Sequence, residues 1–175
     1  MSDMTKPAKD VVLALINTAN GKGLTFEEVQ FGLPTVATTG TKNTVLTLTA
    51  IQGEGYVNSQ TFNYNRLHLT TAILTPSGKD ATFTLGTAKK ISDMIPGLNA
   101  LLGINLGVDD YVDGDLPTFV GGVANEEHDV QVVAKNDSLG YIGSLTFKLK
   151  ADDIDLAQYL TVTDLDGLTY IPPAA

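Results

Sequence analysis

The chain has 175 residues, with 11 Lys and Arg, 20 Asp and Glu, and a formal net charge of −9. Hydrophobic residues make up 43%, enough for a buried core, and the length fits one domain or two small ones. The absence of Cys excludes disulfides, thiolate metal sites and cysteine nucleophiles. The acidic balance argues against sequence-independent binding of DNA or RNA.

Membrane and secretion signals are also missing from the sequence. The N-terminus lacks a basic stretch followed by an apolar one, which is typical of a secretory signal peptide. The longest aliphatic run, Val11 to Ile16, is too short to span a bilayer. We therefore expect synthesis in the cytosol and no membrane partner.

The first elements are predicted to be helical. Residues 10–19 have one apolar face, formed by Val11, Val12, Leu15, Ile16 and Ala19. Gly21 is placed to end this helix. Thr25 and Glu28 have capping-box spacing, which predicts a second short helix over 26–30.

Strands follow. Residues 43–50 alternate between two faces, and the sequence Gly53-Glu54-Gly55 predicts a turn after them. Residues 56–69 are predicted to form the return strand, with a bend near Asn65 where the inward face changes. Residues 70–75 would extend the same ladder.

The rest of the chain contains both helical and strand-like spacing of apolar residues. After a short strand over 81–85, apolar spacing predicts a helix over 88–102, kinked or split at Pro96. Residues 103–117 are predicted to be a loop. The remaining prediction is strands over 118–124, 129–135 and 141–149, a short helix over 153–160 and an extended segment over 161–171. The fold class is then α+β, mainly antiparallel β and sandwich-like, with two or three short helices.

One eight-residue pattern occurs twice. The segment 55–62 matches 140–147 at Gly-Tyr, Ser, Thr and Phe, 85 positions apart, and each copy follows an alternating strand. Each unit is therefore predicted to be a hairpin in which Tyr56 or Tyr141 packs across the strand pair as a structural residue.

The domain organisation follows from this repeat. We expect one domain over 1–175, with two related halves, about 10–86 and 87–171, as a further division. The hairpins 43–64 and 129–149 would then share hand and turn geometry. The competing interpretation is that Gly-Tyr-x-x-Ser-x-Thr is common hairpin sequence.

Catalytic motifs are absent from the sequence. It contains no G-x-S-x-G, no H-E-x-x-H and no G-x-x-x-x-G-K. His68 and His128 are the only histidines, and each is better explained as a strand or loop residue than as a catalytic base. We expect no enzyme activity, no catalytic residue and no cofactor.

An acidic loop is the one weak metal candidate. Asp109, Asp110, Asp113 and Asp115 lie close together in a Gly-containing loop, and calcium prefers several oxygens from such loops. Their spacing is not that of an EF-hand. The alternative, which we favour, is that they serve turn formation and solubility, with no metal bound.

Charge is unevenly distributed along the chain. No Lys or Arg occurs between Lys90 and Lys135, but eight acidic residues do. One interpretation is an acidic surface that meets a basic partner subunit. The other, which is more common, is a solvated face that keeps the protein in solution.

Arg66 is the only arginine in the chain. Its planar guanidinium can tie a loop by paired bonds to a carboxylate or to carbonyl groups, so we predict a structural role. Binding of a ligand phosphate is the alternative.

Apolar residues in the Gly-rich segment 103–125 predict an interface. Leu106, Val108, Leu116 and Phe119 are the candidates, with acidic residues around them as a polar rim. The alternative is that this segment packs on the predicted helix 88–102.

Several short motifs together resemble a domain of virion structural proteins from large tailed bacteriophages. The resemblance covers about 10–171, and its motifs are structural rather than catalytic. It rests on Leu15-Ile16-Asn17, Leu24-Thr25, Phe31-Gly32-Leu33-Pro34, Asn43-Thr44, Gly55-Tyr56, Tyr64-Asn65-Arg66-Leu67, Leu98-Asn99-Ala100-Leu101-Leu102-Gly103 and Leu165-Asp166-Gly167-Leu168-Thr169-Tyr170. After Gly-Tyr this chain has Val57-Asn58-Ser59, where a smaller turn sequence is expected.

The resemblance implies a non-enzymatic structural subunit of a tailed-phage virion, in the tail, the baseplate or on the head surface. It would be made in the host cytoplasm and join other virion structural proteins as a homo- or hetero-oligomer, without nucleic acid or membrane. The alternative is a carbohydrate- or receptor-binding module of a fibre. That function needs exposed aromatic residues, and Tyr111, Phe119 and Tyr170 are the candidates.

Overall fold

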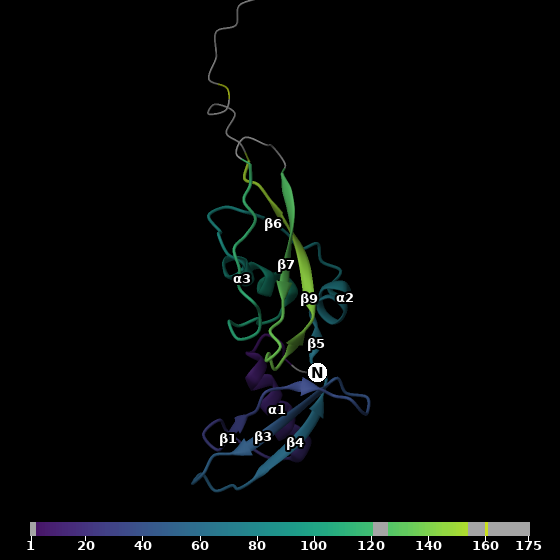
Figure 1. Ribbon diagram of the computed structural model, residues 1–175, viewed down its shortest axis with the longest axis vertical. Helices are drawn as coiled ribbons and strands as arrows, with labels where there is room; N and C mark the ends of the chain where they lie inside the picture. The colour runs from purple at the N-terminus through teal and green to yellow at the C-terminus, as the bar shows by residue number, and fades with distance from the viewer. Residues whose placement is uncertain (1–2, 121–125, 154–159, 161–175) are drawn as a thin grey trace, which may run out of the picture.

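The computed structural model describes residues 3–120, 126–153 and 160. Its helices and strands gather into two units along the long axis of an elongated molecule (Figure 1). Residues 8–66 build the first unit and residues 67–150 the second, and each unit has its own cluster of buried side chains. Leu139 packs against both clusters. The related halves over about 10–86 and 87–171 stay a prediction.

The first unit is a sheet covered by one helix, α1 (Ala8–Asn20). Strand β3 (Thr44–Ala50) lies in the centre of this sheet. On one side it pairs with β1 (Val29–Phe31) and β2 (Thr35–Val36), and on the other with β4 (Ser59–Tyr64), all antiparallel. The prediction of strand 43–50 is thereby confirmed.

Helix α1 confirms the first predicted helix and ends at Gly21, whose φ of 60° is left-handed. The buried cluster of this unit joins α1 to the sheet through Val12, Leu13, Ile16, Val29, Leu46 and Leu48. The predicted apolar face is wrong in part, because Leu15 is 44% exposed and Ala19 is exposed. The helix is rotated so that Leu13 faces the sheet instead.

The second predicted helix, over 26–30, is wrong. The capping-box bond does form, since the backbone N–H of Thr25 donates to Glu28 Oε2 at 2.8 Å, but it closes only a turn. Val29 then pairs with Ala50 at the start of β1. Pairing with β3 therefore overrides the local helical signal.

The chain bends at Asn65 and Arg66, as expected, and enters the second unit. Strand β5 (Leu67–His68) pairs in parallel with β8 (Tyr141–Ile142). Residues 70–75 do not extend the ladder, because the chain forms a π-helix η1 (Leu69–Leu74) that continues into α2 (Thr75–Ser77). His68 starts this helix, since its Nδ1 accepts the backbone N–H of Thr70 at 3.3 Å.

A three-stranded sheet forms the second unit. Strand β9 (Ser144–Lys150) is central, parallel to β6 (Thr82–Thr84) and antiparallel to β7 (Glu127–Val133). Helix α3 (Ile91–Leu102) continues through Pro96 without being split. Residues 118–120 do not form the predicted strand, and the predictions for 121–124, 154–159 and 161–171 lie outside the described residues.

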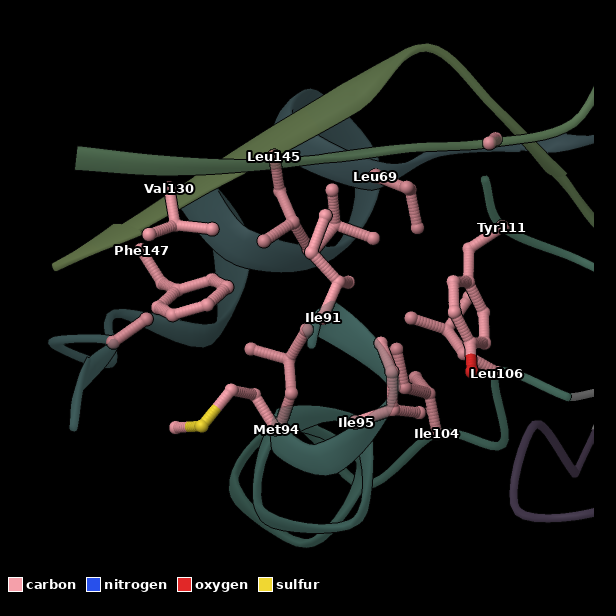
Figure 2. Packing of buried hydrophobic residues seen from close by; sticks show 14 of the residues in the cluster. Leu69, Ile91, Met94, Ile95, Ile104, Leu106, Tyr111, Val130, Leu145 and Phe147 are labelled. Carbon is pink, nitrogen blue, oxygen red and sulfur yellow. The ribbon is translucent and has the colours of Figure 1, made fainter. Parts of the chain in front are cut away.

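The core of the second unit lies between α3 and this sheet (Figure 2). Ile91, Met94 and Ile95 of α3 face Val130, Leu145 and Phe147 of the strands. Leu106 and Tyr111, from the predicted loop 103–117, fill the end of the same core. This loop is fixed by β-bridges from Asp115 to Lys90 and from Tyr111 to Ala134.

Both repeat copies are hairpins, but they differ in register and turn. Ser59 pairs with Thr49, and the repeat offset of 85 would pair the matching Ser144 with Ala134. Ser144 pairs instead with Val133, one position earlier. The side chain of Tyr141 is fully buried, but that of Tyr56 is 49% exposed. Identical turn geometry was therefore a wrong expectation, and only Tyr141 has the predicted packing role.

The fold class is α+β and mainly β, as predicted. The parallel pairings of β5 with β8 and of β6 with β9 are additions that alternation in the sequence does not reveal. Across residues 3–120, 126–153 and 160, no helix combines the length and the apolar character that crossing a membrane requires.

Candidate functional site

The joint between the two units is built around Arg66. Its side chain is 6% exposed, and Nη1 donates to the carbonyl oxygens of Asn136 at 2.8 Å and Ser138 at 3.0 Å. Nε donates to Oγ1 of Thr44 on β3 at 3.0 Å. Arg66 thus ties the first sheet to the 136–138 turn, which confirms its predicted structural role. Burial lowers the pKa of the guanidinium.

Two neighbouring side chains complete this joint. Asn43 holds the backbone of Arg66 in both directions, accepting its N–H at 2.8 Å and donating to its carbonyl at 2.9 Å. The hydroxyl of Tyr64 donates to the carbonyl oxygen of Leu139 at 2.7 Å, and burial raises the pKa of Tyr64 to about 12. Asn43, Thr44 and Tyr64 occur in the motifs of the resemblance, but the sequence did not reveal these contacts, because the bonded residues lie 22 to 75 positions apart.

Asp110 belongs to a buried network next to this joint. Ser138 donates from its hydroxyl to Oδ1 of Asp110 at 2.6 Å, and Gly107 donates its N–H to Oδ2 at 3.0 Å. The same hydroxyl of Ser138 accepts the N–H of Tyr141 at 3.1 Å. Burial raises the pKa of Asp110 more than these two donors lower it.

The weak calcium candidate is not supported by the structure. Asp110 faces Ser138, whereas Asp113 accepts the N–H of Ser92 at the start of α3 at 2.9 Å. That bond is the main cause of a lowered pKa of Asp113. Asp115 lies in the bridge to Lys90, and Asp109 is exposed. Within the part of the chain that the structure describes, no three acidic or histidine side chains gather as a metal site requires.

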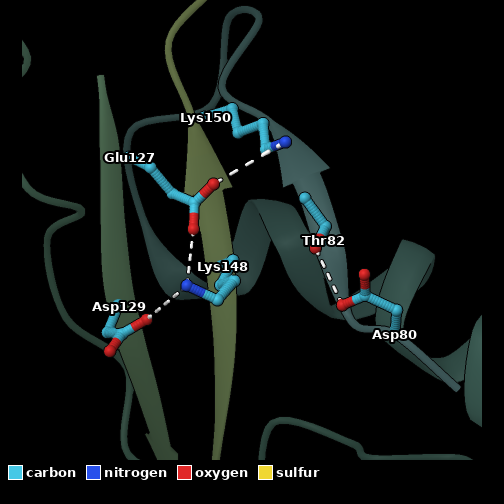
Figure 3. A network of polar contacts seen from close by, with 6 residues as sticks. All are labelled: Asp80, Thr82, Glu127, Asp129, Lys148 and Lys150. Carbon is cyan, nitrogen blue, oxygen red and sulfur yellow. Dashed lines mark hydrogen bonds and ion pairs between the residues drawn. The ribbon is translucent and has the colours of Figure 1, made fainter. Parts of the chain in front are cut away.

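Acidic residues of β7 are matched by lysines of β9 (Figure 3). Lys148 Nζ lies 2.5 Å from Glu127 Oε1 and 3.7 Å from Asp129 Oδ1. Lys150 Nζ lies 3.6 Å from the other oxygen of Glu127. This part of the acidic run is therefore neutralised within the sheet, which weakens the interpretation of the run as a surface for a basic partner.

Most of the predicted interface residues lie in the core. Leu106 and Leu116 are buried, and Phe119 packs partly against the core and edge-on to His128, with ring centroids 4.8 Å apart. Only Val108, at 74% exposed, is free on the surface. The described part of the segment, 103–120, packs mainly in the core that contains α3, in agreement with the alternative that it packs on the predicted helix 88–102.

An apolar groove opens instead on the first unit, beside α1 and β4. We name it the α1–β4 groove; its volume is about 380 Å³, and its apolar lining is Val12, Leu15, Ile16, Ala19, Phe62 and Tyr64. A second hollow, of about 270 Å³, continues from Leu15 to Leu67 and Leu139 at the joint. Asn20, Lys42, Asn63 and Asn65 add polar groups to the lining of the α1–β4 groove. The mainly aliphatic and aromatic side chains of both hollows suit a protein contact more than a reaction.

The comparisons with known proteins add one finding. No curated protein and no solved structure matches the chain. A family of unknown function, DUF7941, matches residues 1–174, which is almost the whole chain. The chain therefore belongs to this family of unknown function.

Proposed function

We propose that the chain is a non-enzymatic structural subunit of a tailed-phage virion, in the tail, the baseplate or on the head surface. It is made in the host cytoplasm and joins other virion structural proteins. The observation that carries this proposal is how its polar side chains are used. Arg66, Asp110 and Asp113 each hold the chain's own backbone or a neighbouring hydroxyl, while the α1–β4 groove stays open to a partner.

The motifs that resemble phage virion proteins support the proposal, because they coincide with the joint and the groove. Asn43-Thr44 and Tyr64-Asn65-Arg66-Leu67 supply most of the contacts around Arg66. Leu15-Ile16 lines the groove. The resemblance therefore falls on residues that shape an assembly surface.

Mass spectrometry of purified virions tests the proposal. Peptides of this chain should co-purify with the particles at a constant copy number relative to the major capsid protein. Peptides that are abundant in the infected-cell lysate but removed by purification of the particles would contradict the proposal.

A receptor- or carbohydrate-binding module of a fibre is the second candidate, favoured by Tyr56. This ring lies at the tip of the β3–β4 hairpin, 49% exposed, next to the exposed Val57. Tyr111, which the sequence offered for this role, is buried, and Tyr170 lies outside the described residues. A glycan array tests this function: a signal that Tyr56→Ala removes would favour it, and no signal would leave the structural role.

A further inference from the structure

Strand β4 has one outer edge with no partner in the described residues, and the internal repeat marks this edge as unusual. The repeat aligns Thr61 of β4 with Thr146 of β9. Strand β9 is paired on both sides, by β6 and β7, whereas within the described ranges β4 is paired only with β3. In the second unit, β6 thus pairs with the edge of β9 that corresponds to the unpaired edge of β4.

The outward-facing backbone groups of β4 can be assigned. Ala50 donates its N–H to the carbonyl of Asn58, and antiparallel bonding alternates along the pair. Residues 60, 62 and 64 therefore bond inward to β3, while Ser59, Thr61 and Asn63 direct their N–H and C=O groups outward. The side-chain amide of Gln60 accordingly donates to the outward carbonyl of Thr61 at 3.2 Å.

This edge lacks the usual protection against pairing. Edge strands commonly carry charged residues or Pro, which discourage contact with another chain. Residues 56–65 contain neither, although the chain has a net charge of −9. By contrast, β7, the long edge strand of the other sheet, carries Glu127 and Asp129.

The α1–β4 groove lies beside the same edge, on the face of the sheet that α1 covers. A strand added to β4 would extend the sheet past α1, and a helix carried on the same face of that strand would cover the groove. Leu15, which is 44% exposed in one copy, would then be shielded from water. In a second copy of this chain, α1 covers the same face of the sheet as here.

We propose that two copies of the chain pair through their β4 strands, antiparallel about a twofold axis at Thr61. Ser59 of each copy then lies opposite Asn63 of the other, and Thr61 lies opposite its own equivalent. A second copy fits because the outward groups are symmetric about Thr61, and because the paired segments, residues 56–65, contain no charged side chain in an otherwise acidic protein. The inference deepens the proposed assembly role by naming the partner, and it rests on that role only for its biological setting.

Cross-linking through an introduced cysteine gives the sharpest test, because the chain has no Cys of its own. Hydrogen-bonded antiparallel pairs place Cα atoms about 5.5 Å apart, within the range of a disulfide. Thr61→Cys should therefore give a covalent dimer under mild oxidation. The matched control Thr146→Cys, on a central strand, should form no covalent dimer, because its cysteine lies away from the proposed axis.

Sedimentation of the uncross-linked protein gives the second test. Wild type should dimerise, and Thr61→Lys, which would place two ammonium groups at the axis, should weaken the dimer roughly tenfold or more. Thr146→Lys should leave the dimer unchanged. Thr61→Pro removes an outward N–H only and should abolish pairing while far-UV circular dichroism stays that of wild type.

The inference is overturned if wild type is monomeric at every concentration reached. It is also overturned if Thr61→Cys and Thr146→Cys cross-link equally, or if Thr61→Lys dimerises like wild type. Its failure is distinguishable from that of the proposed function: a monomer found in purified virions rejects only the pairing, and a dimer missing from virions rejects only the particle role.

Discussion

Nη1 of Arg66 lies 3.0 Å from the carbonyl oxygen of Ser138, a residue 72 positions further along the chain. Ser138 uses its hydroxyl at the same time to bond Asp110. The joint between the two units is therefore continuous with the buried network of the second unit. A substitution that removes the bond of Ser138 to Arg66 should therefore also perturb its bond to Asp110, and the reverse.

Replacement of Arg66 by Ala should lower the free energy of unfolding by about 3 kcal/mol, because the buried carbonyl of Ser138, the partly buried carbonyl of Asn136 and the hydroxyl of Thr44 lose a charged donor. Arg66→Lys should recover little of this, since a single ammonium cannot reproduce the planar fork. Urea unfolding measures both variants. Lys42→Ala, at an exposed position in the same unit, is the control, and a neutral Arg66→Ala would contradict the structural role.

Gly143 should tolerate no side chain. Its φ is 73°, and a Cβ there would overlap the imidazole ring of His68. Gly143→Ala should therefore cost about 2–3 kcal/mol through strain and displacement of the ring. Gly23→Ala, at an open position with no positive φ, should change the melting temperature little by comparison. Equal melting temperatures for the two variants would contradict the close contact.

Asp110 should titrate above the usual aspartate value of 3.8, whereas Asp113 should titrate below it. Because the folded state binds the proton of Asp110 more tightly, its contribution to stability is full below 3.8 and is lost as pH rises through its folded pKa. For Asp113 the sign is opposite: its contribution is present above 3.8 and is lost as pH falls through its folded pKa. Carboxyl ¹³C NMR measures both pKa values.

Ser138→Ala provides the control for this titration. It removes a hydrogen bond that lowers the pKa of Asp110, so that pKa should rise further while that of Asp113 stays unchanged. A pKa of Asp110 at or below 3.8 in the folded protein would contradict the prediction, since it would mean that burial does not outweigh the hydrogen bonds from Ser138 and Gly107.

The two repeat tyrosines should respond differently to the same change. Tyr141→Ala empties a fully buried site and should destabilise by about 3–5 kcal/mol, as large core truncations do. Tyr56→Ala removes an exposed ring and should stay within about 0.5 kcal/mol of wild type. Differential scanning calorimetry of the pair decides, and similar losses would mean that Tyr56 packs as Tyr141 does.

The spacing of apolar residues predicted correctly those elements in which the local sequence pattern and the tertiary contacts favour the same structure. Helix α1 and strand β3 appear as expected because each buries one regular face against the other. The failures lie where tertiary contacts decide. Val29 joined a strand because β3 offered a partner, and residues 69–74 became helical after His68 accepted their first N–H groups.

The candidate site was predictable only where one residue stood out. Arg66 could be identified because a lone arginine next to a strand needs partners, but spacing cannot show which carbonyls it meets. Asp110 and Asp113 were candidate calcium ligands because the sequence does not show that their carboxylates accept hydrogen bonds from backbone N–H groups. The α1–β4 groove depends on the rotation of α1, which leaves Leu15 outside.

The chain passes from the first unit to the second at Arg66, and this sets an order during synthesis. The four strands that the structure describes in the first sheet, and the helix that covers them, have been translated by residue 64. The carbonyl groups that Arg66 requires belong to Asn136 and Ser138, so at least 70 further residues must emerge from the ribosome first. The first sheet can thus fold early. Arg66 stays hydrated until the β7–β9 hairpin has formed and its carbonyl groups bond the guanidinium.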